Sequence, residues 1–105
     1  MTIYKPTKEC TKEILQDNNF KYIDGYYVYR FPVYKYNKTP ILWGQIIIDL
    51  ESTTCYVSVV NNTNNVYAAY HNREYGKNEV LIKIDKTIET QISQLVKIKI
   101  LKVVK

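Results

Sequence analysis

The chain has 105 residues, of which 46% are hydrophobic and 24% charged, so it has the size and composition of one globular domain and not of a disordered segment. Four lysines in the last nine residues supply most of the net charge of +5, which predicts one compact domain over residues 1–105 with a basic tail over residues 97–105. The chain has no apolar run of the roughly 18 residues that a membrane span needs, and its N-terminus lacks the apolar stretch of a signal peptide, so we expect a cytoplasmic protein.

The N-terminal segment predicts a short helix over residues 7–17. Pro6 marks the entry, Thr7 is a suitable N-cap, and Glu9 places an acid in the first turn, where the helix dipole favours it. Eleven residues are too few for a stable isolated helix, so this one must pack on the remainder of the fold. Its expected apolar face consists of Cys10, Ile14 and Leu15.

The stretch Tyr26–Tyr36 predicts the strand around which the sheet is built, because aromatic and β-branched residues fit a pleated, half-buried surface. A short strand over residues 20–23 precedes it, separated by the two-residue turn Asp24-Gly25. Along the long strand the odd positions form a nearly continuous apolar face, and the even positions are mixed. Pro32 lacks an N–H group, so it should lie at a bulge or on an unpaired edge.

Further strands follow in hairpin order. Ile41–Leu50 comes after four residues and is apolar on both faces except at Gln45 and Asp49, which predicts a central strand. Residues 54–60 alternate as a half-buried strand does. After an asparagine-rich turn, residues 66–71 predict a fourth long strand.

From Asn78 the apolar spacing becomes helical, which predicts one long helix with Asn78 as its cap and Lys97–Lys105 at its C-terminal end. The competing interpretation is a strand over residues 79–84 followed by a helix from Asp85. The expected apolar stripe, interrupted at Gln91, consists of Leu81, Ile84, Ile88, Leu95 and Ile98. The predicted fold class is therefore α+β: an antiparallel sheet of four to five strands, with a short N-terminal helix and a longer C-terminal helix packed on one face.

The sequence offers little that could support catalysis. It contains one histidine, His71, and two cysteines without metal-ligand spacing, Cys10 and Cys55, so we expect no metal site and no cofactor. Phosphate-binding glycine motifs are absent. The segment from His71 to Tyr75 supplies proton-transfer and phosphate-binding groups, which makes a small ribonuclease one hypothesis, but a solvated loop is the simpler interpretation, and we expect no enzymatic activity.

Two surfaces remain as candidates for recognition. One is the mixed face of the sheet, where aromatic side chains and Arg30 suit either stacked bases or a protein partner. The other is the lysine-rich C-terminal end, which as a basic amphipathic helix could meet nucleic acid, an anionic membrane or a partner groove. The predicted partner-binding residues are Arg30, Tyr34, Lys35, Tyr36, Lys38, Trp43, Tyr56, Lys99, Lys102 and Lys105.

We therefore predict a small non-catalytic binding protein, an inhibitor or adaptor, that engages a macromolecule through an aromatic sheet face or an edge strand. A phage or mobile-element accessory protein acting on a host defence complex fits this description. A protein partner is expected, and a homodimer would cover the same face. The alternative is a nucleic-acid-binding protein that uses tyrosine and arginine on the sheet together with the C-terminal lysines, and the small ribonuclease is the second alternative.

Overall fold

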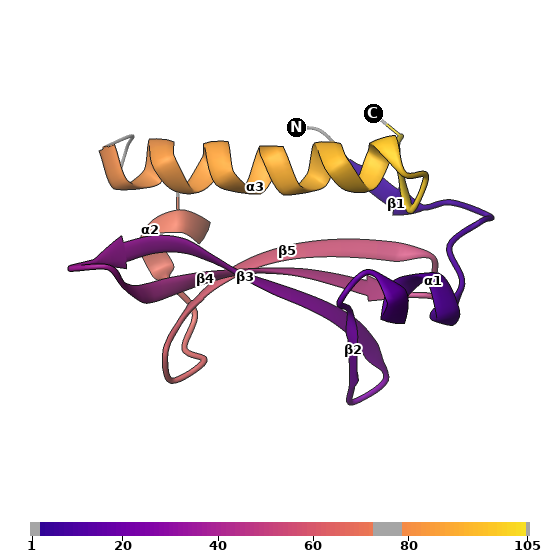
Figure 1. Cartoon of the computed structure of the whole chain (residues 1–105), viewed down its shortest axis with the longest axis horizontal. Coiled ribbons are helices and arrows are strands. Elements are labelled where there is room, and N and C mark those ends of the chain that lie inside the picture. Colours follow the sequence, from indigo (N-terminus) through magenta and orange to yellow (C-terminus); the bar gives the residue numbers. More distant parts are fainter. Residues whose placement is uncertain (1–2, 73–78, 105) are drawn as a thin grey trace.

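The computed structural model describes residues 3–72 and 79–104 and has the predicted α+β architecture, with a helix lying across an antiparallel sheet (Figure 1). The main sheet has four strands in the order β2-β3-β4-β5: β2 (Lys21–Ile23), β3 (Tyr26–Tyr36), β4 (Thr39–Asp49) and β5 (Thr54–Asn61). A second sheet pairs β1 (Tyr4–Pro6) with β6 (Leu101–Val103). The helices are α1 (Lys12–Asp17), α2 (Ala68–His71) and α3 (Glu79–Lys97).

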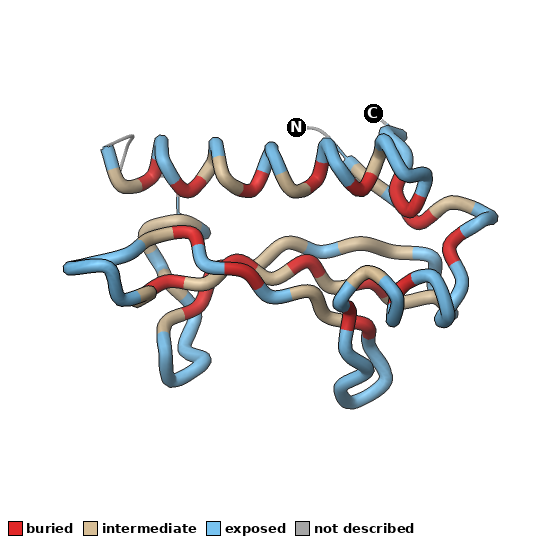
Figure 2. Tube along the Cα trace, in the orientation of Figure 1, coloured by how far each residue is buried: buried red, intermediate tan, exposed pale blue. Residues whose placement is uncertain are grey.

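Helix α3 covers one face of the main sheet, and its buried positions lie on the side of the helix nearest that face (Figure 2). The helical interpretation of residues 79–84 is thus confirmed, while the predicted cap Asn78 lies outside the described residues. Gln91 interrupts the apolar stripe because its Oε1 accepts a hydrogen bond of 3.0 Å from the Tyr29 hydroxyl. Ile98 was wrongly placed on the stripe, since the helix has already ended. The buried helix residues are Leu81, Ile84, Ile88, Ile92 and Leu95.

Two tight hairpins set the register of the main sheet. Asp24 and Gly25 have φ of 49° and 92°, and Asn37 and Lys38 have φ of 49° and 67°, so both residues of each turn have the positive φ that a type I′ turn requires. This geometry matches the right-handed twist of paired strands. The Asp24-Gly25 turn is confirmed, and the second turn is two residues shorter than the predicted four-residue connection, because β4 already begins at Thr39.

The register of β3 on β4 shifts on both sides of Tyr34, which makes a bulge directly after Pro32. The bulge agrees with the position predicted for Pro32, which has no N–H group to donate to a ladder. Within the bulge, Val33 is buried and Tyr34 packs against the same hydrophobic core. Strict alternation therefore fails at this point, and Tyr34 does not share the exposed face of Arg30 as its even number suggested.

The N-terminal helix is shorter than predicted and is capped by a different threonine. The Oγ1 of Thr11 accepts the Ile14 N–H at 3.3 Å, whereas the Thr7 hydroxyl donates to the Lys99 carbonyl 92 residues away. Residues Tyr4–Pro6 are drawn into strand β1 because β6 is available to pair with them. Leu15 is the fully buried residue of α1 and joins the core shared with α3, while Ile14 is exposed.

The C-terminal residues form a capped helix end and a strand, so the prediction that the helix continues into the lysine-rich segment is wrong for the described residues. Lys99 has φ of 67°, its N–H donates to the Val96 carbonyl at 3.1 Å, and the Ile100 N–H donates to the Leu95 carbonyl at 2.9 Å. This is a Schellman motif, which satisfies the last carbonyls of α3. Ile100 and Leu101 are then buried in the core, and β6 begins at Leu101.

The segment after the asparagine-rich turn was predicted as a long strand, and this is also wrong. Val66 makes one isolated bridge to Val60, and α2 follows from Ala68. This segment supplies hydrogen-bond partners to Val59 at the edge of β5. The Val59 carbonyl accepts the Tyr67 N–H at 2.8 Å, and the Val59 N–H donates to His71 Nε2 at 3.2 Å. A helical turn and an imidazole therefore occupy the edge of β5 where a fifth strand was expected.

Both cysteines are free thiols packed in or against the core. Burial raises the pKa of Cys10, and burial followed by repulsion from Cys10 raises the pKa of Cys55 from 9.0 to about 12. Because folding favours the protonated thiol, the contribution of Cys55 to stability is complete below about pH 9 and is lost as the pH rises toward 12.

At pH 9 we therefore expect iodoacetamide to alkylate Cys55 roughly 100 to 1000 times more slowly in the folded chain than in the urea-unfolded chain, because the thiolate is the reactive form. Mass spectrometry of timed reactions measures the two rates. Similar rates in the folded and unfolded chains would show that Cys55 is accessible and ionised in the folded state.

Candidate functional site

The face of the main sheet opposite α3 has no helix lying across it in the described part of the chain, and we call it the open face (Figure 1). The cross-strand pairs Arg30–Gln45, Pro32–Trp43 and Ile47–Tyr56 place their side chains together on this side of the sheet. Two loops project on the same side, the β2–β3 hairpin at one end and the β5–α2 connection at the other (Figure 1). The open face consists of Val28, Arg30, Pro32, Trp43, Gln45, Ile47, Tyr56 and Ser58.

Arg30 and Trp43 are held against one another at the centre of this face. The guanidinium carbon of Arg30 lies 4.7 Å from the centroid of the Trp43 ring, and Arg30 Nη1 donates to Asn64 Oδ1 at 2.8 Å. The Trp43 indole N–H donates to Asn62 Oδ1 at 2.7 Å, and the Asn62 amide donates to the Pro40 carbonyl at 3.3 Å. Both large side chains are thus held by contacts from the β5–α2 connection.

The asparagine-rich turn owes its shape to its own hydrogen bonds. Asn61 Oδ1 accepts the Thr63 N–H at 2.9 Å and the Asn65 N–H at 3.0 Å, and Asn64 adopts φ of 63°. Asparagine side chains favour such local bonds and tolerate the left-handed conformation. The sequence indicated a turn here, but not that Asn62 and Asn64 would reach the side chains of two neighbouring strands.

A cavity of about 590 Å³ opens beside this pair. Its lining contains two cations, Lys21 and Arg30, and no aspartate or glutamate, so a bound anion would meet no like charge from the lining. The apolar part of the lining comes from Ile23, Val28 and the Trp43 ring. The full lining is Asn19, Lys21, Ile23, Val28, Arg30, Trp43, Gln45 and Asn64.

The structure brings together only some of the predicted site residues. Arg30, Trp43 and Tyr56 share the open face, as their strand positions indicated. Lys35, Tyr36 and Lys38 lie at the tip of the β3–β4 hairpin, beyond the bulge. Tyr34 packs against the core. Asn19, Lys21, Asn62 and Asn64 were missed, because no pattern in the sequence relates these polar loop residues to Arg30.

Lys99 and Lys102 lie on the α3 side of the main sheet, away from the open face (Figure 1). Lys99 and Lys102 belong to the turn and strand that follow α3, and they line a separate groove of about 480 Å³ with Lys8 and Glu9. Lys105 lies outside the described residues. Of the residues in the nucleic-acid hypothesis, Arg30 on the open face and Lys99 and Lys102 after α3 therefore lie on opposite sides of the main sheet.

Of the segment from His71 to Tyr75, the structure describes only His71 and Asn72. His71 Nε2, the atom that would accept a proton, already accepts the Val59 N–H, and the predicted neighbours Arg73, Glu74 and Tyr75 lie outside the described residues. Residues 3–72 and 79–104 contain no group of three histidine, cysteine or acidic side chains suited to a metal ion. Among these residues, no helix is long and apolar enough to cross a bilayer.

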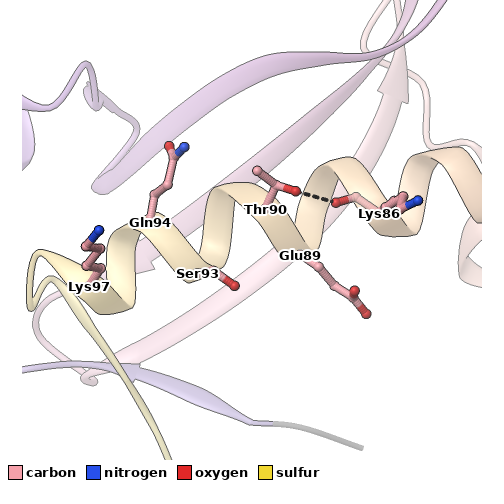
Figure 3. A pocket seen from close by; sticks show the side chains of 6 residues that line it. All are labelled: Lys86, Glu89, Thr90, Ser93, Gln94 and Lys97. Atoms are coloured by element: carbon pink, nitrogen blue, oxygen red, sulfur yellow. Dashed lines mark hydrogen bonds between the residues drawn. The ribbon is translucent and has the colours of Figure 1, made fainter.

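A third hollow, of about 400 Å³, lies along the outer surface of α3 (Figure 3). Every residue that lines it comes from this one helix, and the Thr90 hydroxyl is already used in a 2.9 Å hydrogen bond to the Lys86 carbonyl. On this exposed helix surface Glu89 lies between Lys86 and Lys97 in the sequence. The lining side chains do not converge on a common point (Figure 3). We therefore assign no function to the lining residues Lys86, Glu89, Thr90, Ser93, Gln94 and Lys97.

Comparison with known proteins supports the fold. The structure is similar to the crystal structure of a DUF1831 family protein from Lactobacillus plantarum, with a TM-score of 0.66 over 95% of this chain and 85% of that chain. Their sequence identity is 11%, so the similarity concerns the fold alone. No protein-family model and no curated protein matches the sequence.

Proposed function

We propose that this protein is a small non-catalytic binding module, of the inhibitor or adaptor kind, that engages a protein partner through the open face. The observation that carries the proposal is the immobilised Arg30–Trp43 pair at the centre of a sheet face across which no described helix lies. Tryptophan, tyrosine and arginine supply most of the binding energy in protein interfaces, particularly where they are held in place before binding. Tyr56, 55% exposed on the neighbouring strand, adds a third residue of this kind.

A protein fits this face better than a nucleic acid does. Proteins that bind nucleic acid neutralise several phosphates with lysine or arginine, and the cavity on the open face is lined by only two cations. Base stacking needs a free aromatic face, and the Arg30 guanidinium already covers one face of the Trp43 ring. The apolar side chains of Val28 and Ile47 instead suit the apolar centre of a protein interface.

The test is affinity capture from a lysate of the cells that encode the protein, with and without nuclease. The baits are the wild-type chain, Tyr56→Ala and the matched control Tyr36→Ala, which removes a tyrosine that is 66% exposed at the hairpin tip. We expect one protein to be retained after nuclease treatment, with at least about tenfold weaker binding to Tyr56→Ala and unchanged binding to Tyr36→Ala.

Three outcomes would contradict the proposal. Loss of the captured protein on nuclease treatment would indicate a nucleic-acid ligand. Equal binding to the two tyrosine variants would place the interface away from the open face. Capture of nothing but further copies of this chain, through a contact weakened by Tyr56→Ala, would identify the open face as a homodimer interface.

A further inference from the structure

The lining of the cavity on the open face combines positive charge with apolar side chains, which suits one negative charge on a ligand. Arg30 Nη1 is bonded to Asn64, which uses one of the five N–H donors of the guanidinium, and the Trp43 ring supports the guanidinium plane. Lys21 adds a second positive charge to the lining, and no carboxylate lines the cavity. A planar guanidinium fixed in this way matches the two oxygens of a carboxylate.

From this geometry we infer that the cavity binds an aspartate or glutamate side chain of the protein partner, with an apolar residue of the same segment packed on Ile23 and Val28. The inference rests on the proposed function and names the chemistry of the partner. A carboxylate next to an apolar side chain satisfies both halves of the lining, the cations and the aliphatic groups. A free phosphate would interact with the cations but not with the aliphatic groups.

The fixed geometry of Arg30 also has an energetic consequence. A free arginine side chain loses considerable rotamer entropy when it is ordered in an interface, and here the contacts with Trp43 and Asn64 have already ordered it. The charge-assisted hydrogen bonds that a carboxylate makes are stronger than those of a neutral amide of the same shape. The cavity should therefore distinguish glutamate from glutamine.

Trp43 gives a direct signal for this site because it is the one tryptophan of the chain. The probes are the blocked dipeptide acetyl-leucyl-glutamyl-amide, its neutral counterpart acetyl-leucyl-glutaminyl-amide, and inorganic phosphate. Each is titrated into the isotope-labelled full chain, and the indole N–H resonance and fluorescence of Trp43 are followed. We expect saturable changes with the glutamyl dipeptide and at least about tenfold weaker binding of the glutaminyl dipeptide and of phosphate.

Two variants test whether Arg30 is responsible for the preference for the glutamyl dipeptide. Arg30→Gln should abolish the preference for glutamyl over glutaminyl, while the matched control Lys35→Gln, which removes an equal charge at the hairpin tip, should retain it. Should Arg30→Gln fail to fold, the comparison of the two dipeptides on the wild-type chain still decides the matter. Equal affinity for the two dipeptides, affinity for phosphate as high as for the glutamyl dipeptide, or no response of Trp43 would each overturn the inference.

The captured partner separates this inference from the proposal on which it rests. If Tyr56→Ala abolishes capture and Arg30→Gln leaves it unchanged, the open face binds the partner but Arg30 does not receive a carboxylate. If neither substitution weakens capture, the proposed function itself fails.

Discussion

Replacement of Ile100 by alanine is expected to lower the free energy of unfolding by about 2–5 kcal/mol, the range measured for deleting most of a buried aliphatic side chain. Ile100 is fully buried, with 0% of its surface exposed, where the capped end of α3 leads into β6. Its carbonyl also accepts the Thr7 N–H at 3.0 Å, which ties the two ends of the chain together. For a domain of this size, such a loss is a large part of the total stability.

The matched control is Ile98→Ala, which makes the same chemical change two residues earlier. Ile98 is 51% exposed in the turn after α3, so the expected loss is within about 0.5–1 kcal/mol. Urea unfolding followed by far-ultraviolet circular dichroism measures both values. If the two variants lost the same stability, the C-terminal segment would be a solvated tail, as the sequence suggested, and not part of the core.

Replacement of Gly44 by alanine is expected to destabilise the chain by about 1–3 kcal/mol, because added volume in a packed core forces neighbouring side chains from their preferred positions. Gly44 lies directly opposite Phe31 in the β3–β4 ladder. A Cβ atom built on Gly44 would come within 2.7 Å of the Phe31 ring and 2.9 Å of the Val33 Cγ1. Phe31 is buried beneath α3 and has little room to move.

A double-mutant cycle tests the cause of this loss. Phe31→Leu removes the ring that the new methyl group meets, so Gly44→Ala should cost less in the Phe31→Leu background than in the wild-type chain. Gln45→Ala is the neighbouring control, since its side chain lies on the open face and its loss should change stability little. An unchanged penalty in the Phe31→Leu background would show that the glycine is needed for another reason.

Part of the open face was visible in the sequence because it depends on strand periodicity. Arg30, Trp43 and Tyr56 were predicted from their strand positions, and antiparallel pairing places all three on one face. The contact between Arg30 and Asn64 was not predictable, because it joins a strand to a loop 34 residues later through a single hydrogen bond. Tyr34 was misassigned because a bulge changes the alternation without changing the composition.

By itself, the sequence determined the elements whose signals are local. The Asp24-Gly25 turn follows from the φ angles that these residues tolerate, and β3, β4, β5 and α3 follow from apolar periodicity over eight or more residues. Only the tertiary structure determined that segments near the two ends of the chain form strands. Strands β1 and β6 have three residues each, too few to show a period, and they exist because α3 carries one end of the chain back beside the other. The same long-range pairing places Lys99 and Lys102 beside β1, away from the open face.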